Sequence, residues 1–566
     1  MLKTKNYDFD AIVIGSGITG GWAAKELTEK GLKVLVLERG KDLKHGVGYL
    51  GEHAPDWKLP YQGKRPRDLY EQEYPVQSTS YAFSETSRQF FNNDKENPYV
   101  RDGEKPFDWI RADVVGGRSL IWGRQTYRWS ELDFQANALD GHGIPWPIGY
   151  QDIAPWYSYV EKFAGISGEA LGLEELPDSE FLPPMGMHKL EETIKGRLKK
   201  KAPDVHMTIG RAAILTQDHE GRAACHYCGP CHRGCSTGSY FSSQSSTLPA
   251  ARATGNMTLR PNSVVDKLVY DDASKSIREV RVIDSVSGER LSFRSRLVFL
   301  CASTVGSTQL LMNSAAQAFP TGLGNHSGAL GHYMMDHAMG LAGMGIFLDD
   351  MDTYWHGNRP NGTYIPRFRN IKGRQEKNFV RGYGYQAHAI RMNWQSSFNK
   401  KGFGAELKDS LRKPGPWVWA LAAFAECLPD ERNRMYLHAT QKDRFGIPQV
   451  AFDATWRENE YKLWDDAVEQ SDRLLKAAGA VFSIKQEKLE SNMGAGIHEM
   501  GTARMGDDPM EAVLNGNNQV HGIPNLFVTD GACMTSASCV NPSLTYMALT
   551  ARACDYAVKQ MQAGLI

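Results

Sequence analysis

Two side chains near the carboxyl end of the chain, His498 and Asn541, could act together in acid–base chemistry. A neutral imidazole accepts a proton near neutral pH, and an amide N–H stabilises a developing alkoxide. Pro542 restricts Asn541 to an extended backbone, which helps to fix the direction of its amide. The pair would therefore suit the removal of a proton from an alcohol. A structural histidine and an ordinary Asn-Pro turn are the alternative interpretations.

Four cysteines with the spacing C-x2-C-x2-C-x3-C are crowded into residues 225–235; they are Cys225, Cys228, Cys231 and Cys235. This is the spacing of a bacterial ferredoxin run, with Ser236 in place of the usual proline. The sequence has no second run, so we expect one iron–sulfur cluster, 3Fe–4S or 4Fe–4S, held by three or four thiolates. Zinc is the less favoured alternative, because structural zinc usually takes two separated pairs of ligands. Five other cysteines are predicted to be buried free thiols, namely Cys301, Cys427, Cys533, Cys539 and Cys554.

A dinucleotide-binding pattern occupies the first 38 residues. It consists of an apolar strand at 11–14, Gly15, Gly17 and Gly20 in the order G-x-G-x-x-G, a helix at 22–27, a second strand at 34–37, and Glu38. The glycines allow a tight turn, the approach of a pyrophosphate to the helix N-terminus, and close packing of helix on strand. An acid at the end of the second strand accepts from ribose hydroxyls, which favours FAD or NAD over NADP. An ordinary strand–helix–strand turn is the alternative.

Composition excludes several classes of protein. The 566 residues include 65 Lys plus Arg and 65 Asp plus Glu, so no net charge draws the chain to nucleic acid or to anionic lipid. A hydrophobic content of 41% predicts a globular protein with a large core. Residues 1–8 lack the apolar stretch of a signal peptide, which predicts a cytoplasmic protein. The longest apolar run, 417–425, is too short to span a membrane and is expected to be a buried strand or helix.

Beyond residue 40 the alternation of strand and helix stops and later resumes. Residues 41–110 are rich in Tyr, Pro, Arg and Asn, which indicates an excursion from the first domain. Residues 336–490 hold alternating aromatic runs and an amphipathic helix near 457–478, which is typical of a second, mostly antiparallel lobe. Between them, strands are expected at 257–270, 280–285, 291–293 and 296–303.

Several motifs in order resemble one family. The C-terminal third reads His498-Glu-Met-Gly-Thr-Ala-Arg-Met-Gly, then Val520-His-Gly-Ile-Pro-Asn-Leu-Phe-Val-Thr-Asp530-Gly, then Asn541-Pro-Ser-Leu-Thr-Tyr-Met-Ala-Leu. With the N-terminal glycines and the V-G-G-x-S-x-x-W-G stretch at 115–123, this closely resembles the glucose–methanol–choline (GMC) oxidoreductase family. The resemblance implies an α/β (α+β) fold, in which a Rossmann-like FAD-binding domain is interleaved with a mostly antiparallel β-sheet substrate-binding domain.

We expect the two domains to alternate along the chain. The FAD-binding domain is expected to comprise residues 1–60, 107–150, 206–335 and 495–566, with a Cys-rich iron–sulfur loop at 222–240. The substrate-binding lobe and its excursions are expected to comprise residues 61–106, 151–205 and 336–494.

The resemblance also implies site residues. It makes His498 the base and Asn541 its partner. Pyranose oxidases of the family often attach their flavin to a histidine in the Gly-Gly loop, and Ile121 stands at that position here, which implies non-covalent FAD. The residues that match the family's FAD contacts are Gly15, Gly17, Gly20, Glu38, Gly117, Ser119, Val265, Ala302, Asp530, Gly531 and Thr545.

The Asn541-Pro motif resembles the sugar-acting branch of pyranose oxidases and glucoside 3-dehydrogenases. We therefore expect an FAD-dependent dehydrogenase that oxidises a sugar hydroxyl, with C3 of a glucoside as the expected position and a 3-keto sugar as the product. Its electrons are expected to leave through the iron–sulfur cluster to a cytochrome c-type acceptor. Related dehydrogenases are exported with a small signal-bearing subunit, so a periplasmic location with such a partner is the alternative to the cytoplasm.

Two other functions compete with this interpretation. One is a pyranose-type oxidase that reduces O2 and has a structural metal in the cysteine cluster, and the other is a redox or sensing module that binds FAD without turnover. Two further histidines, His337 and His521, are not expected in the site, because one follows a Met-Met-Asp segment and the other begins a turn. Polar residues that could contact a sugar, or could be ordinary sheet positions, are Tyr383, Tyr385, Gln386, His388 and Glu426.

Overall fold

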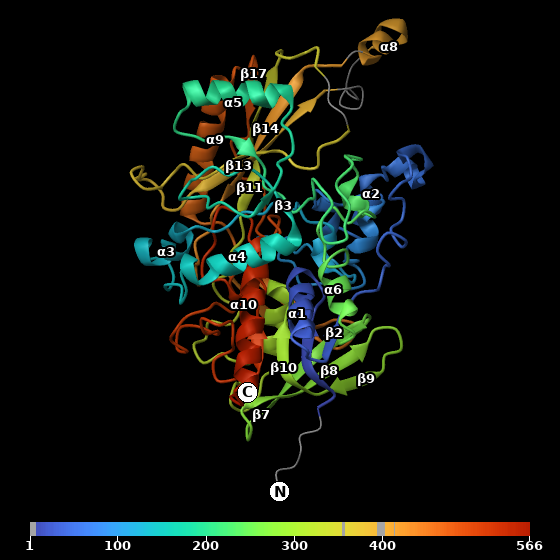
Figure 1. The fold of residues 1–566 in the computed structure, drawn as a ribbon, viewed down its shortest axis with the longest axis vertical. Helices are drawn as coiled ribbons and strands as arrows, with labels where there is room; N and C mark the ends of the chain where they lie inside the picture. The colour runs from blue at the N-terminus through green and yellow to red at the C-terminus, as the bar shows by residue number, and fades with distance from the viewer. Residues whose placement is uncertain (1–6, 354–356, 393–401, 413) are drawn as a thin grey trace.

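The computed structural model describes residues 7–353, 357–392, 402–412 and 414–566. The molecule is elongated, with a parallel sheet in one lobe and a larger antiparallel sheet in the other (Figure 1). The first strand and the last helix both belong to the lobe with the parallel sheet. This is the mixed α/β architecture that the sequence predicts.

The parallel sheet consists, in spatial order, of β18 (Leu526–Val528), β10 (Ser295–Leu300), β1 (Phe9–Ile14), β2 (Val34–Leu37) and β6 (Met257–Arg260). Its central strands are short apolar runs that are almost wholly buried, as expected of parallel strands covered on both faces. The helices of this lobe are α1 (Ile18–Glu29), α6 (Thr247–Ala253), α7 (Thr304–Asn313) and α10 (Ser543–Gln562). Helix α1 packs against both α6 and α10. The N-terminal pattern therefore forms the strand–helix–strand unit that it predicts.

A small antiparallel sheet completes this lobe. It is formed by β7 (Ser263–Asp271), β8 (Ser276–Asp284) and β9 (Arg290–Phe293). Val280 pairs with Phe293 and Val282 with Leu291, which confirms the predicted pairing of two strands around the turn at 287–288.

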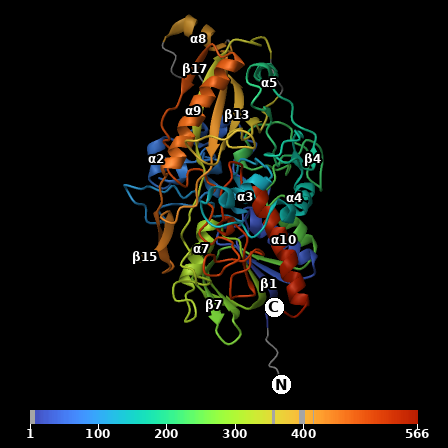
Figure 2. The same ribbon diagram turned by 90° about the vertical axis from the view of Figure 1, so that its left-hand side faces the viewer.

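The six-stranded antiparallel sheet dominates the second lobe. Its spatial order is β17 (Phe482–Lys485), β11 (Ala338–Phe347), β14 (Trp417–Ala425), β13 (Tyr383–Arg391), β12 (Thr363–Ile365) and β5 (Thr208–Ile209). Helix α9 (Glu458–Ala478) lies along this sheet, with α5 (Lys189–Lys201) beside it (Figure 2). The apolar run at 417–425 is thus a strand, and its buried tryptophans alternate with half-exposed residues because side chains alternate between the faces of a sheet.

Shorter elements complete the fold. The remaining helices and strands are α2 (Arg67–Glu71), α3 (Glu131–Asp140), α4 (Tyr150–Ala164), α8 (Gly404–Arg412), β3 (Ile166–Ser167), β4 (Phe181–Leu182), β15 (Arg434–Lys442) and β16 (Pro448–Asp453). Short 3-10 helices lie at Asp56–Lys58, Pro60–Gly63, Gln77–Thr79, Ser87–Phe90, Gly117–Leu120, Cys231–Arg233 and Gly531–Cys533. Within the described residues, no helix combines the length and the apolar character that a membrane crossing requires.

The strands are distributed along the chain much as the domain prediction implies. Every strand of the parallel sheet falls in a segment predicted for the FAD-binding domain, and five strands of the six-stranded sheet fall within 336–494. The exception is β5, which belongs to the antiparallel sheet although residues 206–335 are predicted for the first domain. The domain boundaries themselves stay a prediction.

Candidate active site

A cavity of about 630 Å³ lies where the strands of the parallel sheet end. Residues within two positions of the ends of β1, β2, β10 and β18 all line it, which is the place where open α/β sheets bind their ligands. The predicted site residues that line this cavity are Gly15, Gly17, Glu38, Gly117, Ser119, Val265, Ala302, His498, Asp530, Gly531 and Asn541. The structure thus brings together residues from both ends and the middle of the chain.

The three glycines of the N-terminal turn have different surroundings. A Cβ atom on Gly15, whose φ is +99°, would lie 2.3 Å from the carbonyl oxygen of Cys301, and one on Gly20 would lie 2.0 Å from the carbonyl oxygen of Gly15. A Cβ atom on Gly17 would meet nothing within 4 Å. The first and third glycines therefore permit close packing within the chain, whereas the second leaves free space beside the helix N-terminus. That space fits a pyrophosphate.

Two buried carboxylates stand at the strand ends. Glu38 accepts hydrogen bonds from the backbone N–H of Ser16 at 3.0 Å and of Gly40 at 2.8 Å, and burial raises its pKa. Asp530 accepts from the backbone N–H of Ala532 at 3.1 Å, and burial raises its pKa to about 6. Because each carboxylate oxygen can accept more than one hydrogen bond, both can also accept from hydroxyl groups of a ligand in the cavity. This donor set fits the ribose and ribityl hydroxyls of FAD.

Two predicted FAD contacts mainly face the protein. The hydroxyl of Ser119 donates to the carbonyl oxygen of Gly116 at 2.6 Å and shapes the Gly-Gly loop. The hydroxyl of Thr545 pairs with that of Tyr157 at 2.7 Å, and Thr545 is fully buried at the start of α10. The roles of these residues toward FAD stay predictions.

Asp336 accepts hydrogen bonds from the backbone around His498. The carboxylate of this fully buried residue accepts from the backbone N–H groups of Gly494 at 2.8 Å and Gly496 at 2.9 Å, and from that of His498 at 3.1 Å. The residue before the histidine, Ile497, has a φ of +59°, a conformation that β-branched residues rarely adopt. This strained turn, stabilised by a buried carboxylate, fixes the position of His498.

His337 fixes the protonation pattern of His498. The Nδ1 atoms of the two rings lie 2.8 Å apart, and Nε2 of His337 contacts the carbonyl oxygen of Ser538. Because a carbonyl only accepts, Nε2 of His337 carries its proton, and Nδ1 of the neutral ring must accept. His498 therefore donates from Nδ1, and its Nε2 carries a lone pair that can accept. That nitrogen lies on the side of Asn541.

Burial keeps both imidazoles neutral. It lowers the pKa of His337 to about 4. Burial, together with the nearby His337 and Arg118, holds the pKa of His498 well below 6.5. The Nε2 atom of His498 is thus available as a base at neutral pH.

Asn541 is oriented by a neighbour from the second lobe. The side-chain nitrogen of Gln386 donates to Oδ1 of Asn541 at 2.7 Å, so that Nδ2 of Asn541 is the atom that approaches Nε2 of His498, at 3.3 Å. Nδ2 of Asn541 thus donates to the lone pair of His498 Nε2. A hydroxyl group that replaces this contact could donate to His498 and accept from Asn541.

Further polar and aromatic side chains line the cavity. They are Tyr81, Trp122, Arg124, Gln125 and His232. Arg124 is 4% exposed; its guanidinium donates to the carbonyl oxygens of Trp122 and Pro360 and lies over the ring of Tyr240. This wall gives the cavity donors, acceptors and aromatic faces.

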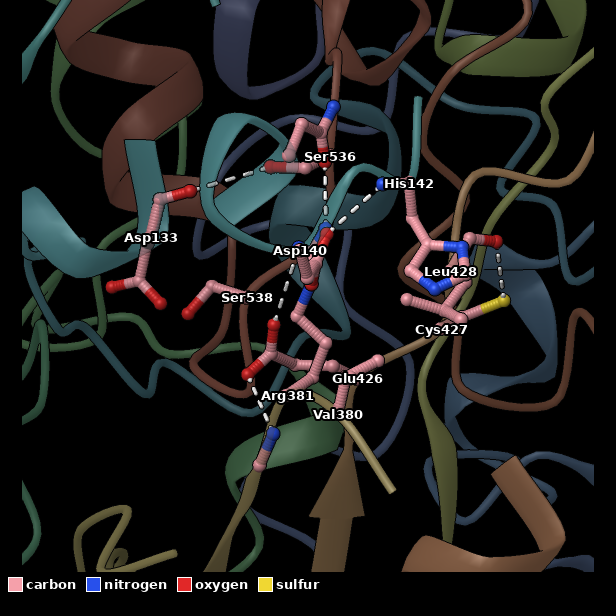
Figure 3. A network of polar contacts seen from close by, with 12 residues as sticks. Asp133, Asp140, His142, Val380, Arg381, Glu426, Cys427, Leu428, Ser536 and Ser538 are labelled. Carbon is pink, nitrogen blue, oxygen red and sulfur yellow. Dashed lines mark hydrogen bonds and ion pairs between the residues drawn. The ribbon is translucent and has the colours of Figure 1, made fainter. Parts of the chain in front are cut away.

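Most of the strand residues that could contact a sugar lie elsewhere. Tyr383 and Tyr385 point to α9, where the hydroxyl of Tyr385 donates to the carbonyl oxygen of Ala467. Glu426 is fully buried and pairs with Arg367 at 2.8 Å and with Arg381 at 3.7 Å. Figure 3 shows Glu426 and Arg381 in one polar network with Asp140. Among these strand residues, Gln386 lines the cavity.

The sequence prediction missed two residues of the site. Asp336 positions the backbone of His498, and His337, which was not expected in the site, positions its ring. The prediction that His337 lies outside the site is therefore wrong. An adjacent Asp-His pair directly before the first strand of the second lobe is the signal that could have revealed it. His521, in contrast, bonds to the carbonyl oxygen of Gly506, away from His498.

The four cysteines of residues 225–235 line a second cavity, of about 1140 Å³. All are free thiols; Cys228 is exposed, and Cys225, Cys231 and Cys235 are half-buried. Across the part of the chain that the structure describes, no three Cys, His, Asp or Glu side chains are arranged to hold a metal ion. Pro360 lines both cavities, so the two are neighbours. The thiols thus share one cavity without preformed ligand geometry, and the iron–sulfur cluster stays a prediction.

The chain matches the sequence model of one family in two places. The description of that family is GMC oxidoreductase, and the matches cover residues 9–339 and residues 429–550. Together they include the N-terminal glycines, most of the residues that line the two cavities, and the segments that carry His498 and Asn541.

Similar proteins extend over nearly the whole chain. The 2-methyl-1,2-propanediol dehydrogenase of Mycolicibacterium austroafricanum is 28% identical over 97% of this chain and 94% of its own length. The fructose dehydrogenase large subunit of Gluconobacter japonicus is 25% identical, with both chains covered completely. The crystal structure of pyridoxine 4-oxidase from Mesorbium loti superposes with a TM-score of 0.60 and 16% identity, covering 97% of this chain and 98% of that one. This last similarity concerns the fold.

Proposed function

The chain belongs to the GMC oxidoreductase family, and from this membership we propose that it oxidises a sugar hydroxyl to a carbonyl with FAD as its cofactor. As a member it is a flavin-dependent oxidoreductase of alcohol-type or sugar-type donors. C3 of a glucoside is the proposed position, and a 3-keto sugar is the product. The FAD is proposed to be non-covalent, because Ile121 in the Gly-Gly loop lines the cavity and offers no nucleophile.

One observation carries the proposal: Nδ2 of Asn541 and Nε2 of His498 lie 3.3 Å apart and both residues line the cavity, so that their N–H and lone pair can meet one substrate hydroxyl. A substrate hydroxyl placed there gives its proton to His498 and accepts a hydrogen bond from Asn541 as the alkoxide develops. His337 accepts from the other side of the imidazole and keeps the proton-accepting nitrogen toward the substrate. Bound FAD supplies the acceptor for the hydride of the same carbinol carbon.

The polarity of the cavity supports a sugar as the substrate. A sugar carries several hydroxyls, which require several donors and acceptors at fixed positions. Arg124, Gln125 and Gln386 offer such groups, and Tyr81 and Trp122 offer aromatic surfaces for the apolar face of a sugar ring. A relative named for fructose, and another named for a diol, agree with a polyhydroxylated donor.

The Cys-rich loop is proposed to hold one iron–sulfur cluster, with zinc as the less favoured metal. Four thiols around one cavity provide the ligand type that such a cluster requires. A cluster bound there would supply one-electron transfer, which suits a cytochrome c-type acceptor. A relative named as a large subunit supports a small partner subunit. The location, cytoplasmic or periplasmic by co-export, is proposed to depend on that partner.

A steady-state assay of the purified protein with glucosides and an artificial electron acceptor tests the proposal. Formation of a 3-keto sugar with little consumption of O2 is the expected result. Efficient reduction of O2 would favour a pyranose-type oxidase instead. Retention of FAD without turnover of any sugar or simple alcohol would indicate a binding module and refute the proposed function.

A further inference from the structure

One face of the six-stranded sheet carries apolar side chains that, among the described residues, are exposed or half-exposed. Helix α9 packs against the opposite face, where Trp417 and Trp419 are fully buried. On the first face, Ile390 of β13 is 54% exposed, and Phe482 and Ile484 of β17 are 56% and 46% exposed. Large apolar side chains that gather on one exposed surface mark a binding region more often than isolated ones do.

The strand register connects this face to the active-site cavity. Three successive rows of cross-strand neighbours run outward: Leu341, Ala422 and Gln386, then Met344, Ala420 and His388, then Ile346, Val418 and Ile390. Ala422 and Gln386 line the cavity, and Gln386 also orients Asn541. Rows on one face are two residues apart along a strand, so the third row lies about 13 Å from the first. These rows, with Phe482 and Ile484 at the edge, are termed the apolar face.

The one polar side chain of the outer rows does not interrupt the apolar character. His388 is half-buried, and burial together with the nearby Arg359 lowers its pKa. At neutral pH its ring is therefore uncharged and can contact an apolar group. On one side of it in the sheet, Ala420 of β14 and then Met344 of β11 are half-exposed.

We propose that the apolar face is a subsite for the apolar aglycone of a glycoside whose sugar ring lies in the active-site cavity. This inference rests on the proposed oxidation of a sugar. The face and the cavity share Ala422 and Gln386, so a ligand can lie on both surfaces without leaving the protein. A protein partner on this face would instead close that side of the cavity. An aglycone joined to the reacting sugar is therefore the occupant that the continuity favours.

The size of the effect follows from the area of contact. A methylene group that is fully transferred from water to an apolar contact gains a factor of about four in affinity. A flat surface covers one side of an alkyl chain, so that the gain is about twofold for each methylene. An octyl chain has seven more carbons than a methyl group, so the expected advantage is about tenfold even if only half of them contact the face.

The test compares methyl β-glucoside with octyl β-glucoside, both below the concentration at which the octyl compound forms micelles, on the FAD-loaded enzyme. The octyl compound is expected to have a kcat/KM at least about tenfold higher. The difference should come from a lower KM at an unchanged kcat, because the apolar face is remote from the reacting carbon. Calorimetric binding of octyl β-glucoside gives a readout that is independent of turnover.

Variants localise the effect. Ile390→Lys, and Met344→Lys closer to the cavity, are expected to remove most of the octyl advantage and to leave the kinetics of methyl β-glucoside unchanged. Val286→Lys is the matched control, since Val286 is 79% exposed in the turn between β8 and β9. This variant should leave the kcat/KM values of both glucosides unchanged.

The outcomes separate this inference from the proposed function. Equal kcat/KM values for the two glucosides, or an octyl advantage that persists in both lysine variants, would overturn the subsite while sugar oxidation stands. Oxidation of neither glucoside would refute the proposed function and the subsite together. A dimer that Ile390→Lys dissociates would show that the face is an interface between copies, and the subsite would be wrong.

Discussion

His337 should control the rate of proton removal although it lies behind the base. The substitution His337→Phe keeps a ring of similar size in this fully buried position but removes the atom that accepts from Nδ1 of His498. A buried N–H without a partner costs about 1–3 kcal/mol. The imidazole of His498 can avoid this cost by changing tautomer, which leaves a proton on the nitrogen that should accept one. With 1.36 kcal/mol for each tenfold change, substrate oxidation should slow about 10- to 100-fold.

The pH dependence distinguishes this role from a structural one. Burial, His337 and Arg118 hold the pKa of His498 below 6.5, so the base stays deprotonated until the pH falls through that lowered value. The rate should therefore be constant above pH 6.5 and decrease only at lower pH. Removal of His337 takes away one of the groups that lower this pKa. The decrease of the rate at acidic pH, termed the acidic limb of the pH–rate profile, should therefore move to higher pH. Anaerobic single-turnover measurements across the pH range, at saturating substrate, give both quantities.

A conservative variant serves as the control. In His337→Gln the amide oxygen can accept from His498 while its nitrogen donates to the carbonyl oxygen of Ser538, so most of the rate should return. The reasoning is refuted if His337→Phe retains its FAD, reacts within about twofold of the native rate and keeps the native acidic limb. A loss of FAD or of thermal stability without a displaced limb would indicate a packing role.

Four further expectations concern the cofactors and the base. His498→Ala should keep FAD and lose about 10²–10⁴-fold in the rate of substrate oxidation, and Asn541→Ala should lose less. Near-normal turnover of His498→Ala would exclude His498 as the base. Acid should release FAD from the protein, whereas flavin that stays on the denatured chain would disprove non-covalent binding. Gly17→Ala should fold normally but bind FAD more weakly, and Gly20→Ala should melt at lower temperature, because only the second would clash with the backbone of the chain. Metal analysis should find iron, and Cys231→Ser should leave oxidation with an artificial acceptor intact while slowing transfer to a cytochrome c-type protein; zinc, or unchanged transfer, would contradict this.

The first strand–helix–strand unit of the parallel sheet could be predicted because its signals are local. The two apolar strands, the glycines and the acid stand within 38 residues, and the structure gives a steric reason for Gly15 and Gly20, such as the 2.0 Å approach that a Cβ on Gly20 would have to the backbone of Gly15. The antiparallel lobe could be predicted only in character. Its strands are paired across long separations, and the pairing of β5 with β12 joins residues that no local pattern relates.

The substrate lobe illustrates a second limit. Tyr383 and Tyr385 share one face of β13, and Gln386 and His388 share the other, as the alternation of a strand requires. The sequence could separate these two pairs, but it could not tell which pair faces the cavity. That depends on α9, which covers the face with the tyrosines and leaves Gln386 to meet Asn541.

The position of His337 shows why a single motif does not define this site. His498 and Asn541 lie in the C-terminal segment, 43 residues apart, and the motif there suffices to nominate them. Their protonation and direction, however, are set by His337 at the start of β11 and by Gln386 in β13, both in the second lobe. The lobe that is proposed to bind the substrate thus also decides which nitrogen of His498 is basic and which atom of Asn541 faces the hydroxyl. Substitutions on this edge of the antiparallel sheet should consequently change kcat as well as KM, in contrast to substitutions on the outer rows of the apolar face, which touch neither His498 nor Asn541.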